Sequence, residues 1–97
     1  MAGYVIVQAE ITNMEKFKKY LNESPGIIAK YGGKYLARAG ETIVLEGNPD
    51  NRRLVIIEFP SLEKAKEWYH SEEYRKVKEL RKGAATGSLI AIEGSAQ

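Results

Sequence analysis

The chain has 97 residues, of which 43% are apolar and 29% charged, and it contains no cysteine. This length suffices for one hydrophobic core, so we expect a single domain over residues 1–97. The 15 basic and 13 acidic side chains give a net charge of +2 and form no basic stripe, so we expect no nucleic-acid partner. The absence of cysteine excludes disulfides and thiolate metal sites.

The first residues lead directly into an apolar run at residues 4–7, with no charged segment before it. This pattern does not resemble a secretory leader. No apolar stretch approaches the ~18 residues that a membrane span needs. We therefore expect a cytoplasmic protein with no membrane partner.

The first half of the chain predicts a strand followed by a helix. Apolar side chains alternate over residues 4–11, which predicts a strand. Residues 12–15 form a capping box, so a helix should begin there. Ser24 and Pro25 resemble a new helix start and predict a kink or restart. The glycines at 32–33 should end this helix.

The second half of the chain predicts two more strands before a helix and a strand after it. Residues 34–39 and 53–59 favour strands, whereas 42–46 form an extended segment of uncertain pairing and 47–51 a turn cluster. Ser61 should cap the next helix, and Ser71 provides a second start signal within it. The last strand is expected over residues 88–93, with a frayed tail after it that ends at Gln97.

This order, β-α-β-β-α-β, predicts an α+β fold of the ferredoxin-like type. Its four-stranded antiparallel sheet has the first and third strands in the centre and both helices on one face. The better-defined strands carry apolar residues on both faces; in the third strand, Leu54 and Ile56 lie opposite Val55 and Ile57. An apolar sheet face left bare would exceed what soluble monomers usually expose. We therefore expect a homodimer in which the two sheets pack together.

The chain also resembles a known family through a series of short motifs: Tyr31-Gly32-Gly33, Arg38-Ala39-Gly40, Leu45-Glu46-Gly47, Glu58-Phe59-Pro60-Ser61, Trp68-Tyr69, Ser71 to Tyr74, Arg81 and Glu93-Gly94. In this order they resemble the 1330 family of domains of unknown function, within the dimeric α/β-barrel superfamily, over residues 4–94. The resemblance implies a ferredoxin-like homodimer whose sheets form a barrel, and it implies no activity. The wider superfamily includes small monooxygenases, isomerases and haem-handling enzymes. The chain departs from the family pattern at Asn48-Pro49 and at Glu72.

The candidate catalytic residues are Glu58 and Arg38, which we place on the face that meets the partner, with Glu93 and Gln8. Glu58 and Glu93 should lie at one end of the sheet, where a carboxyl pair beside an apolar cavity suits acid–base work. The alternative is that both are solvated and paired with Lys or Arg. Arg38, at the other end near Gln8, either grips a carboxylate or phosphate or forms a salt bridge.

The candidate ligand-binding residues are Tyr69, Tyr74, Arg81, Glu93 and Gln8. The two tyrosines flank the break in the second helix and either line a pocket mouth or belong to the core. Trp68 beside them is expected in the core. Arg81 either caps the helix end or contacts a ligand anion.

The single histidine, His70, is expected to be exposed, and with no cysteine in the chain we expect no metal site. RNA recognition by this fold needs aromatic residues on the central strands, and the third strand presents Leu54, Ile56 and Glu58 instead.

Two functions remain. The first is a dimer that binds a small organic molecule between sheet and helices in each subunit, in a pocket near the uncovered sheet face, with an unknown cofactor requirement and possible acid–base catalysis. The second is a structural or interaction homodimer without a ligand.

Overall fold

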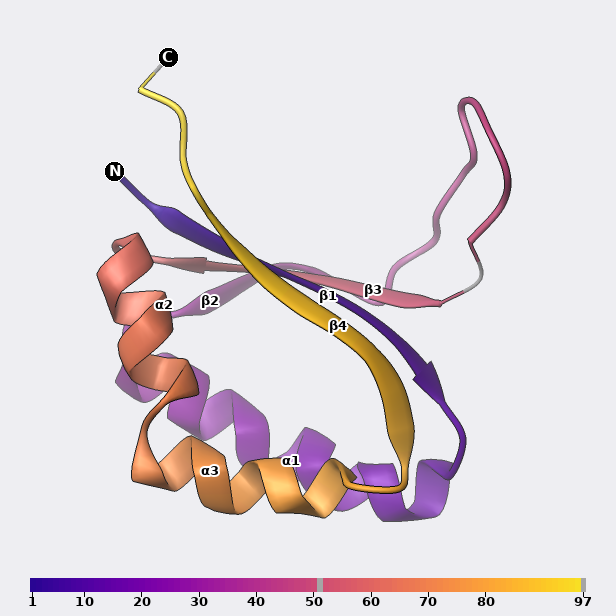
Figure 1. Cartoon of the computed structure of the whole chain (residues 1–97), viewed down its shortest axis with the longest axis horizontal. Coiled ribbons are helices and arrows are strands. Elements are labelled where there is room, and N and C mark those ends of the chain that lie inside the picture. Colours follow the sequence, from indigo (N-terminus) through magenta and orange to yellow (C-terminus); the bar gives the residue numbers. More distant parts are fainter. Residues whose placement is uncertain (51, 97) are drawn as a thin grey trace.

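A computed structural model describes residues 1–50 and 52–96. Asn51, in the predicted turn cluster, and Gln97, at the end of the predicted tail, lie outside the described residues. The elements follow the expected order (Figure 1): β1 Gly3–Ile11, α1 Met14–Lys30, β2 Lys34–Arg38, β3 Arg53–Phe59, α2 Leu62–Tyr69, α3 Glu72–Lys78, a 3₁₀ turn η1 Glu79–Arg81, and β4 Ala85–Glu93.

The four strands form one antiparallel sheet in the order β2-β3-β1-β4. The helices lie on one side of this sheet, and its other face carries no helix (Figure 1). The register places Tyr4 opposite both Glu58 and Ile92. Residues paired in this way share a face of the sheet, so the register fixes which side chains point toward the helices. The ferredoxin-like α+β fold is confirmed.

The hydrophobic core lies between the sheet and the helices. Its largest fully buried side chains are Phe59, Trp68 and Tyr74. The ring centroids of Phe59 and Trp68 are 5.3 Å apart, and those of Trp68 and Tyr74 are 4.4 Å apart. Tilted rings at these separations pack favourably beyond the area that they bury. The structure confirms Trp68 as a core residue.

Helix α1 begins one residue later than the capping box predicts, because Asn13 is the N-cap and its Oδ1 accepts a hydrogen bond from the Lys16 amide at 3.1 Å. The predicted restart at Ser24 is wrong, since α1 continues through Pro25 to Lys30. An interior proline costs a helix about 3 kcal/mol. Ser24 and Ile28 are both buried on the two sides of Pro25, and this packing favours a continuous helix despite the lost hydrogen bond.

The predicted break in the second helical segment is confirmed at Ser71. The Ser71 hydroxyl donates to the Trp68 carbonyl at 2.8 Å and accepts from the Tyr74 amide at 3.1 Å. It therefore ends α2 and caps α3 at once. This turn brings the rings of Tyr69 and Tyr74 to 5.5 Å centroid separation.

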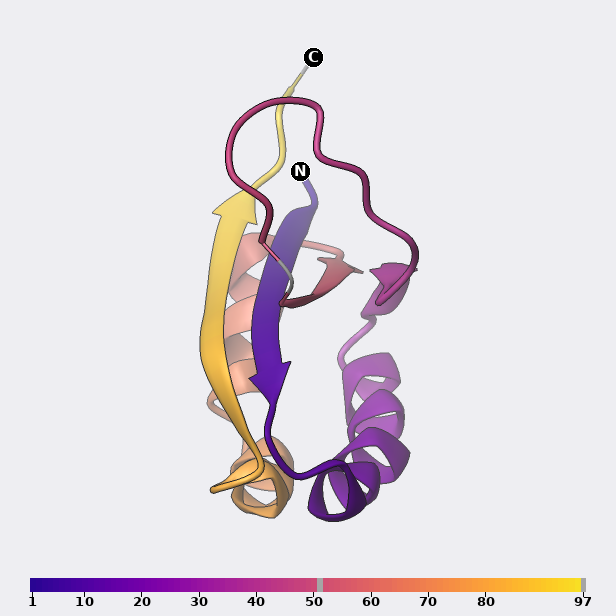
Figure 2. The same ribbon diagram turned by 90° about the vertical axis from the view of Figure 1, so that its right-hand side faces the viewer.

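The expected extended segment at residues 42–46 pairs with no strand in the described part of the chain. Instead, residues 39–50 form an arm that projects away from the helices, on the side of the uncovered sheet face (Figures 1 and 2). Three consecutive apolar side chains on this arm, Ile43, Val44 and Leu45, are 74%, 53% and 89% exposed. No other element in the described part of the chain buries them.

Candidate ligand-binding cleft

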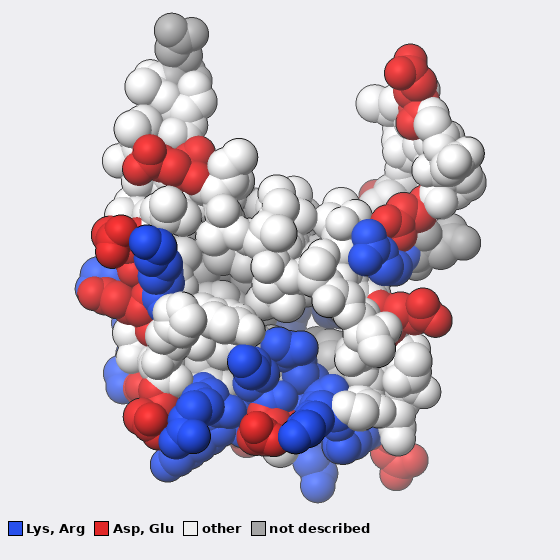
Figure 3. All heavy atoms as spheres, in the orientation of Figure 1, with Lys and Arg blue, Asp and Glu red and all other residues white. Residues whose placement is uncertain are grey.

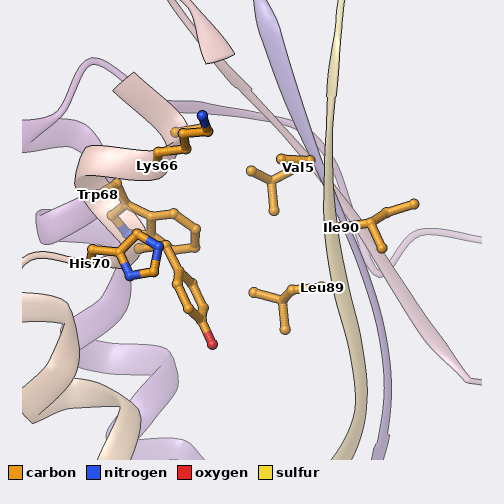
Figure 4. A pocket seen from close by; sticks show the side chains of 9 residues that line it. Val5, Lys66, Trp68, His70, Leu89 and Ile90 are labelled. Carbon is orange, nitrogen blue, oxygen red and sulfur yellow. The ribbon is translucent and has the colours of Figure 1, made fainter. Parts of the chain in front are cut away.

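Three small hollows lie between the sheet and the helices, beside the core, and Leu89 lines all three. We call these three hollows together the cleft. The first hollow has a volume of about 180 Å³ and lies between α2 and the strands β1 and β4. Figure 4 shows Trp68 and His70 on the helix side, facing Val5 and Leu89, whereas Ile90 points to the opposite face of β4.

The second and third hollows adjoin each other beneath the centre of the sheet. They are smaller, at about 50 and about 30 Å³. Both are lined by the same five residues, Val7, Ala9, Phe17, Tyr20 and Leu89. The second hollow extends toward Arg38 and Arg53, and the third toward Arg81. Leu89 is half-buried and is the one residue that lines all three hollows.

Basic side chains gather below the opening of the cleft. Figure 3 shows a hollow between the sheet and the helices with Lys and Arg atoms along its lower rim. Arg81 lines the third hollow, and Arg38 and Arg53 line the second. Within residues 1–50 and 52–96, none of these three arginines forms an ion pair. The cleft is therefore positively charged and lacks an internal counter-ion.

Arg81 lies in a cluster of tyrosine hydroxyl groups. The hydroxyl oxygens of Tyr20 and Tyr74 are 2.6 Å apart, and the Arg81 guanidinium carbon is 5.8 Å from the centroid of the Tyr20 ring. Burial, with the nearby Tyr20, holds the pKa of the Tyr74 hydroxyl far above its usual range. The Arg81 Nε is buried and has no hydrogen-bond partner in the described part of the chain.

A second group of polar side chains lies at the β2 end of the cleft. Arg38 stacks on Tyr35, with its guanidinium carbon 4.4 Å from the ring centroid. Burial raises the pKa of the Tyr35 hydroxyl, an effect that the charges of Arg38 and Arg53 partly offset. Tyr35 is therefore a hydrogen-bond donor at neutral pH.

Three of the predicted ligand-binding residues meet in this cleft. Tyr69 lines the first hollow, Arg81 lines the third, and Tyr74 joins the two through its ring contact with Tyr69 and its hydrogen bond to Tyr20. The Tyr69 hydroxyl also accepts a hydrogen bond from the Lys78 ammonium group at 3.1 Å. The part that these side chains play in binding stays a prediction.

The expected position of Arg38 on the uncovered face is wrong. Strict alternation along β2 puts Lys34 and Arg38 on the same face, but the register shifts between Tyr35 and Ala37. This irregularity adds one residue and reverses the parity of the side chains that follow it. Arg38 consequently pairs with Val55, whose side chain faces the helices.

Glu58 and Glu93 lie at the same end of the sheet, as expected, but on opposite faces. Glu58 pairs with Tyr4, whereas Glu93 pairs with Gly3. The predicted carboxyl pair therefore does not form. Glu58 instead forms an ion pair with Lys34 at 3.3 Å on the uncovered face. This contact matches the alternative interpretation of Glu58 given above.

Gln8 lies on the uncovered face, away from the cleft. It lines an open groove of about 400 Å³ between the sheet and the arm. Its side-chain oxygen accepts a hydrogen bond from Arg52 at 3.2 Å, and Arg52 is held by Asp50 at 2.9 Å. Gln8 and the Arg81 cluster therefore belong to different surfaces.

The sequence interpretation did not single out Tyr20, Tyr35 or Leu89. Tyr20 was predictable, because residues 17, 20, 21 and 24 share one helical stripe and its hydroxyl needs a partner inside the protein. Tyr35 follows Lys34 in the strand, so alternation predicts that its side chain points to the helix-facing side of the sheet. The position of Leu89 between three hollows depends on tertiary packing and leaves no local signal.

Within the described residues, no three His, Cys, Asp or Glu side chains are placed to hold a metal ion. A separate finding, restricted to the same residues, is that no helix is both long and apolar enough to cross a bilayer.

The fold and the cleft define a small ferredoxin-like α+β protein with a hollow between its sheet and its helices. The chain belongs to the DUF1330 family, a domain of unknown function, whose model matches residues 2–95. The search of curated proteins found no match.

Several solved structures share the fold. RPA0582, a protein of unknown function from Rhodopseudomonas palustris, is 19% identical, with a TM-score of 0.77 over 99% of this chain and 84% of that one. SnoaB, a cofactor-independent oxygenase from Streptomyces nogalater, is 9% identical, with a TM-score of 0.69 over 99% and 95%. A dimeric protein of unknown function with a ferredoxin-like fold from Bacteroides fragilis is 13% identical, with a TM-score of 0.63 over 96% of each chain.

Proposed function

We propose that this protein is a homodimer that binds one small organic molecule in the cleft of each subunit. The observation that carries this proposal is the meeting of three hollows at Leu89, with an apolar lining into which hydroxyl and guanidinium groups project. Ligand sites usually combine an apolar wall with a few polar groups in this way. The proposed place of binding is therefore the space between sheet and helices, away from the uncovered face.

The homodimer is proposed from the uncovered sheet face. Ile90 and Ile92 on this face are 58% and 56% exposed, and Ile6, Leu54 and Ile56 lie on the same face by register. A contiguous apolar surface of this kind marks an interaction site. The likeness in fold to a dimeric protein from Bacteroides fragilis supports the proposal.

For the finer function we propose acid–base chemistry in the cleft. The group available there is the Tyr20 hydroxyl, which lines the second and third hollows and shares a short hydrogen bond with Tyr74. We assign Glu58 to the subunit interface through its ion pair with Lys34, and we keep Arg38 as a contact at the β2 end of the cleft. SnoaB, a cofactor-independent oxygenase, has a similar fold, and it supports acid–base chemistry in this protein by analogy only.

Native mass spectrometry of gently purified protein tests both parts. We expect a two-chain mass that carries additional small-molecule mass. Leu89→Phe should fill the cleft, keep the two-chain mass and lose the bound molecule, whereas Met14→Phe, at an exposed position outside the cleft, should keep both. A bare two-chain mass for the unaltered protein would favour the alternative, a structural homodimer. A one-chain mass would remove the interface, and retention by Leu89→Phe would contradict the cleft.

A further inference from the structure

We propose that the molecule bound in the cleft is an organic anion, whose carboxylate is held by Arg81 beside the hydroxyl groups of Tyr20 and Tyr74. The inference rests on the proposed function, because it names the ligand class of the same cleft. It concerns one end of the cleft, the third hollow, which Arg81 and Tyr20 line; the buried Tyr74 hydroxyl bonds to Tyr20 behind it.

Arg81 carries a half-buried positive charge without a carboxylate partner. The six ion pairs among residues 1–50 and 52–96 all involve other side chains. Its buried Nε donates to no acceptor within the same residues. A guanidinium withdrawn from water in this way is destabilising unless an anion compensates it. A carboxylate bound in the third hollow, which Arg81 lines, supplies the counter-charge.

The hydroxyl groups around Arg81 complete an anion site. The Arg81 guanidinium carbon is 5.8 Å from the Tyr20 ring centroid. Tyr20 and Tyr74 together own two hydroxyl protons, and their 2.6 Å hydrogen bond uses one of them. With the buried Tyr74 as the donor, the proton of Tyr20, which lines the hollow, is available to an incoming oxygen. A guanidinium beside a free hydroxyl donor matches the two oxygens of a carboxylate.

The other two arginines of the cleft are weaker anchors. Arg38 is exposed and stacks on Tyr35, so water already solvates much of its charge. Arg53 lies at the same end, opposite Ala9 in the register. Attraction by the exposed Arg38 is weaker than by Arg81. Arg53 is half-buried like Arg81, but among the described residues only Arg81 has a buried guanidinium nitrogen without a hydrogen-bond partner. We therefore expect Arg81 to set the preference for an anion.

The rest of the cleft limits the body of the ligand. The third hollow is walled by Val7, Phe17 and Leu89 and, at about 30 Å³, holds only the carboxylate, so the body of the ligand lies beyond Leu89 in the other two hollows. Even the first hollow, at about 180 Å³, is below the ~300–1,000 Å³ of pockets that hold drug-sized molecules. An apolar wall and a small volume favour a single-ring or short-chain carboxylate.

The test compares benzoate with benzamide, which have nearly the same shape but differ in charge. Trp68 is the only tryptophan of the chain and lines the first and second hollows, so its fluorescence reports occupancy of the cleft. We expect benzoate to bind about tenfold or more tightly than benzamide, since a hydrogen bond to a charged group contributes about 1.5–3 kcal/mol.

Three variants then identify the anchor. Arg81→Met should weaken benzoate binding about tenfold or more and leave benzamide binding unchanged. Tyr20→Phe, which removes only a hydroxyl group, should reduce the ratio of the two affinities by a smaller factor. Arg75→Met is the matched control, because Arg75 is exposed on α3 and paired with Glu72 at 2.8 Å, outside the cleft.

Equal affinities for benzoate and benzamide, or an unchanged benzoate affinity in Arg81→Met, would overturn the anion inference and leave the proposed function intact. Absence of saturable binding by either probe would overturn the inference as well. Native mass spectrometry then decides independently whether the cleft holds some other molecule. Should Arg81→Met fail to fold, the affinity ratios of the unaltered protein and of Tyr20→Phe decide the question.

Discussion

Gly87 lies in β4 directly opposite Ala9 of β1 and has no room for a side chain. A Cβ atom built there would lie 2.0 Å from the Gln8 carbonyl oxygen and 2.7 Å from the Ala9 Cα atom. Both contacts are with backbone, so the strands would have to move apart. We expect Gly87→Ala to lower the free energy of unfolding by about 1–3 kcal/mol, measured by urea denaturation.

Gly26 provides the matched control at the same scale, because nothing lies within 4 Å of a Cβ atom built there. It lies inside α1, where alanine is favoured over glycine by about 0.5–1 kcal/mol. Gly26→Ala should therefore raise the free energy of unfolding. An unchanged midpoint for Gly87→Ala would show that β1 and β4 separate without cost at this position.

Alternation predicted side-chain direction correctly only where the strands are regular. Val55 and Ile57 face the helices as the pattern requires, and both are buried. Arg38 does not follow its pattern, because the register shift after Tyr35 reverses it. No turn residue or glycine at Leu36 announces that irregularity, so the sequence alone placed Arg38 on the wrong face.

At the scale of elements, capping residues predicted helix limits well because a cap is a local interaction. Ser61 and Ser71 both accept a hydrogen bond from the amide three residues later, at 3.1 Å in each case. The restart predicted at Ser24 was wrong because the continuity of the helix depends on packing around Ser24 and Ile28, which is not local. The proximity of Tyr69 and Tyr74 could be predicted from the sequence, because the turn at Ser71 brings the two tyrosines together. Arg81 follows on the same helical segment.

The end of α1 is joined to α3 by a contact that should respond to pH. Glu73 accepts a hydrogen bond from the Tyr31 hydroxyl at 3.1 Å and forms an ion pair with Lys30. The Lys30 ammonium holds the pKa of the Glu73 carboxyl below its ordinary value of 4.5, and Glu73 raises the pKa of Lys30 above 10.5. The stabilisation is therefore present between these values and is lost as the pH falls through the lowered pKa or rises through the raised one.

We expect Glu73→Gln to melt at a lower temperature than the unaltered protein at pH 7, with the difference disappearing below the lowered pKa. Glu72→Gln is the matched control, because Glu72 pairs with Arg75 within α3 and joins no second helix. Its effect should be smaller, since exposed pairs within one helix contribute little. Thermal unfolding between pH 2 and pH 9 measures both variants. An equal loss at every pH would mean that the charge of Glu73 does not stabilise the contact.

At the scale of the whole molecule, the uncovered face lies between two projections, the arm at one end and the C-terminal residues at the other (Figure 3). The sequence predicted the apolar face because both sides of β3 are apolar. It did not predict the arm, because residues 42–46 have the composition of a strand, and only the absence of a neighbouring strand leaves them unpaired. In the proposed homodimer, this face and the arm would both meet the second copy.

The arm should therefore strengthen the homodimer. It contains three of the 13 acidic residues of the chain, none of its 15 basic ones, and the exposed apolar run 43–45, so a second copy offers both an apolar surface and opposite charge. The double substitution Ile43→Ser and Leu45→Ser should raise the dimer dissociation constant at least about tenfold, since burying one such side chain contributes about 1.5–3 kcal/mol. Met14→Ser, at a 47% exposed position in the helix layer, should leave it unchanged. Analytical ultracentrifugation measures all three proteins, and an equally tight dimer in the double variant would show that the arm lies free of the partner.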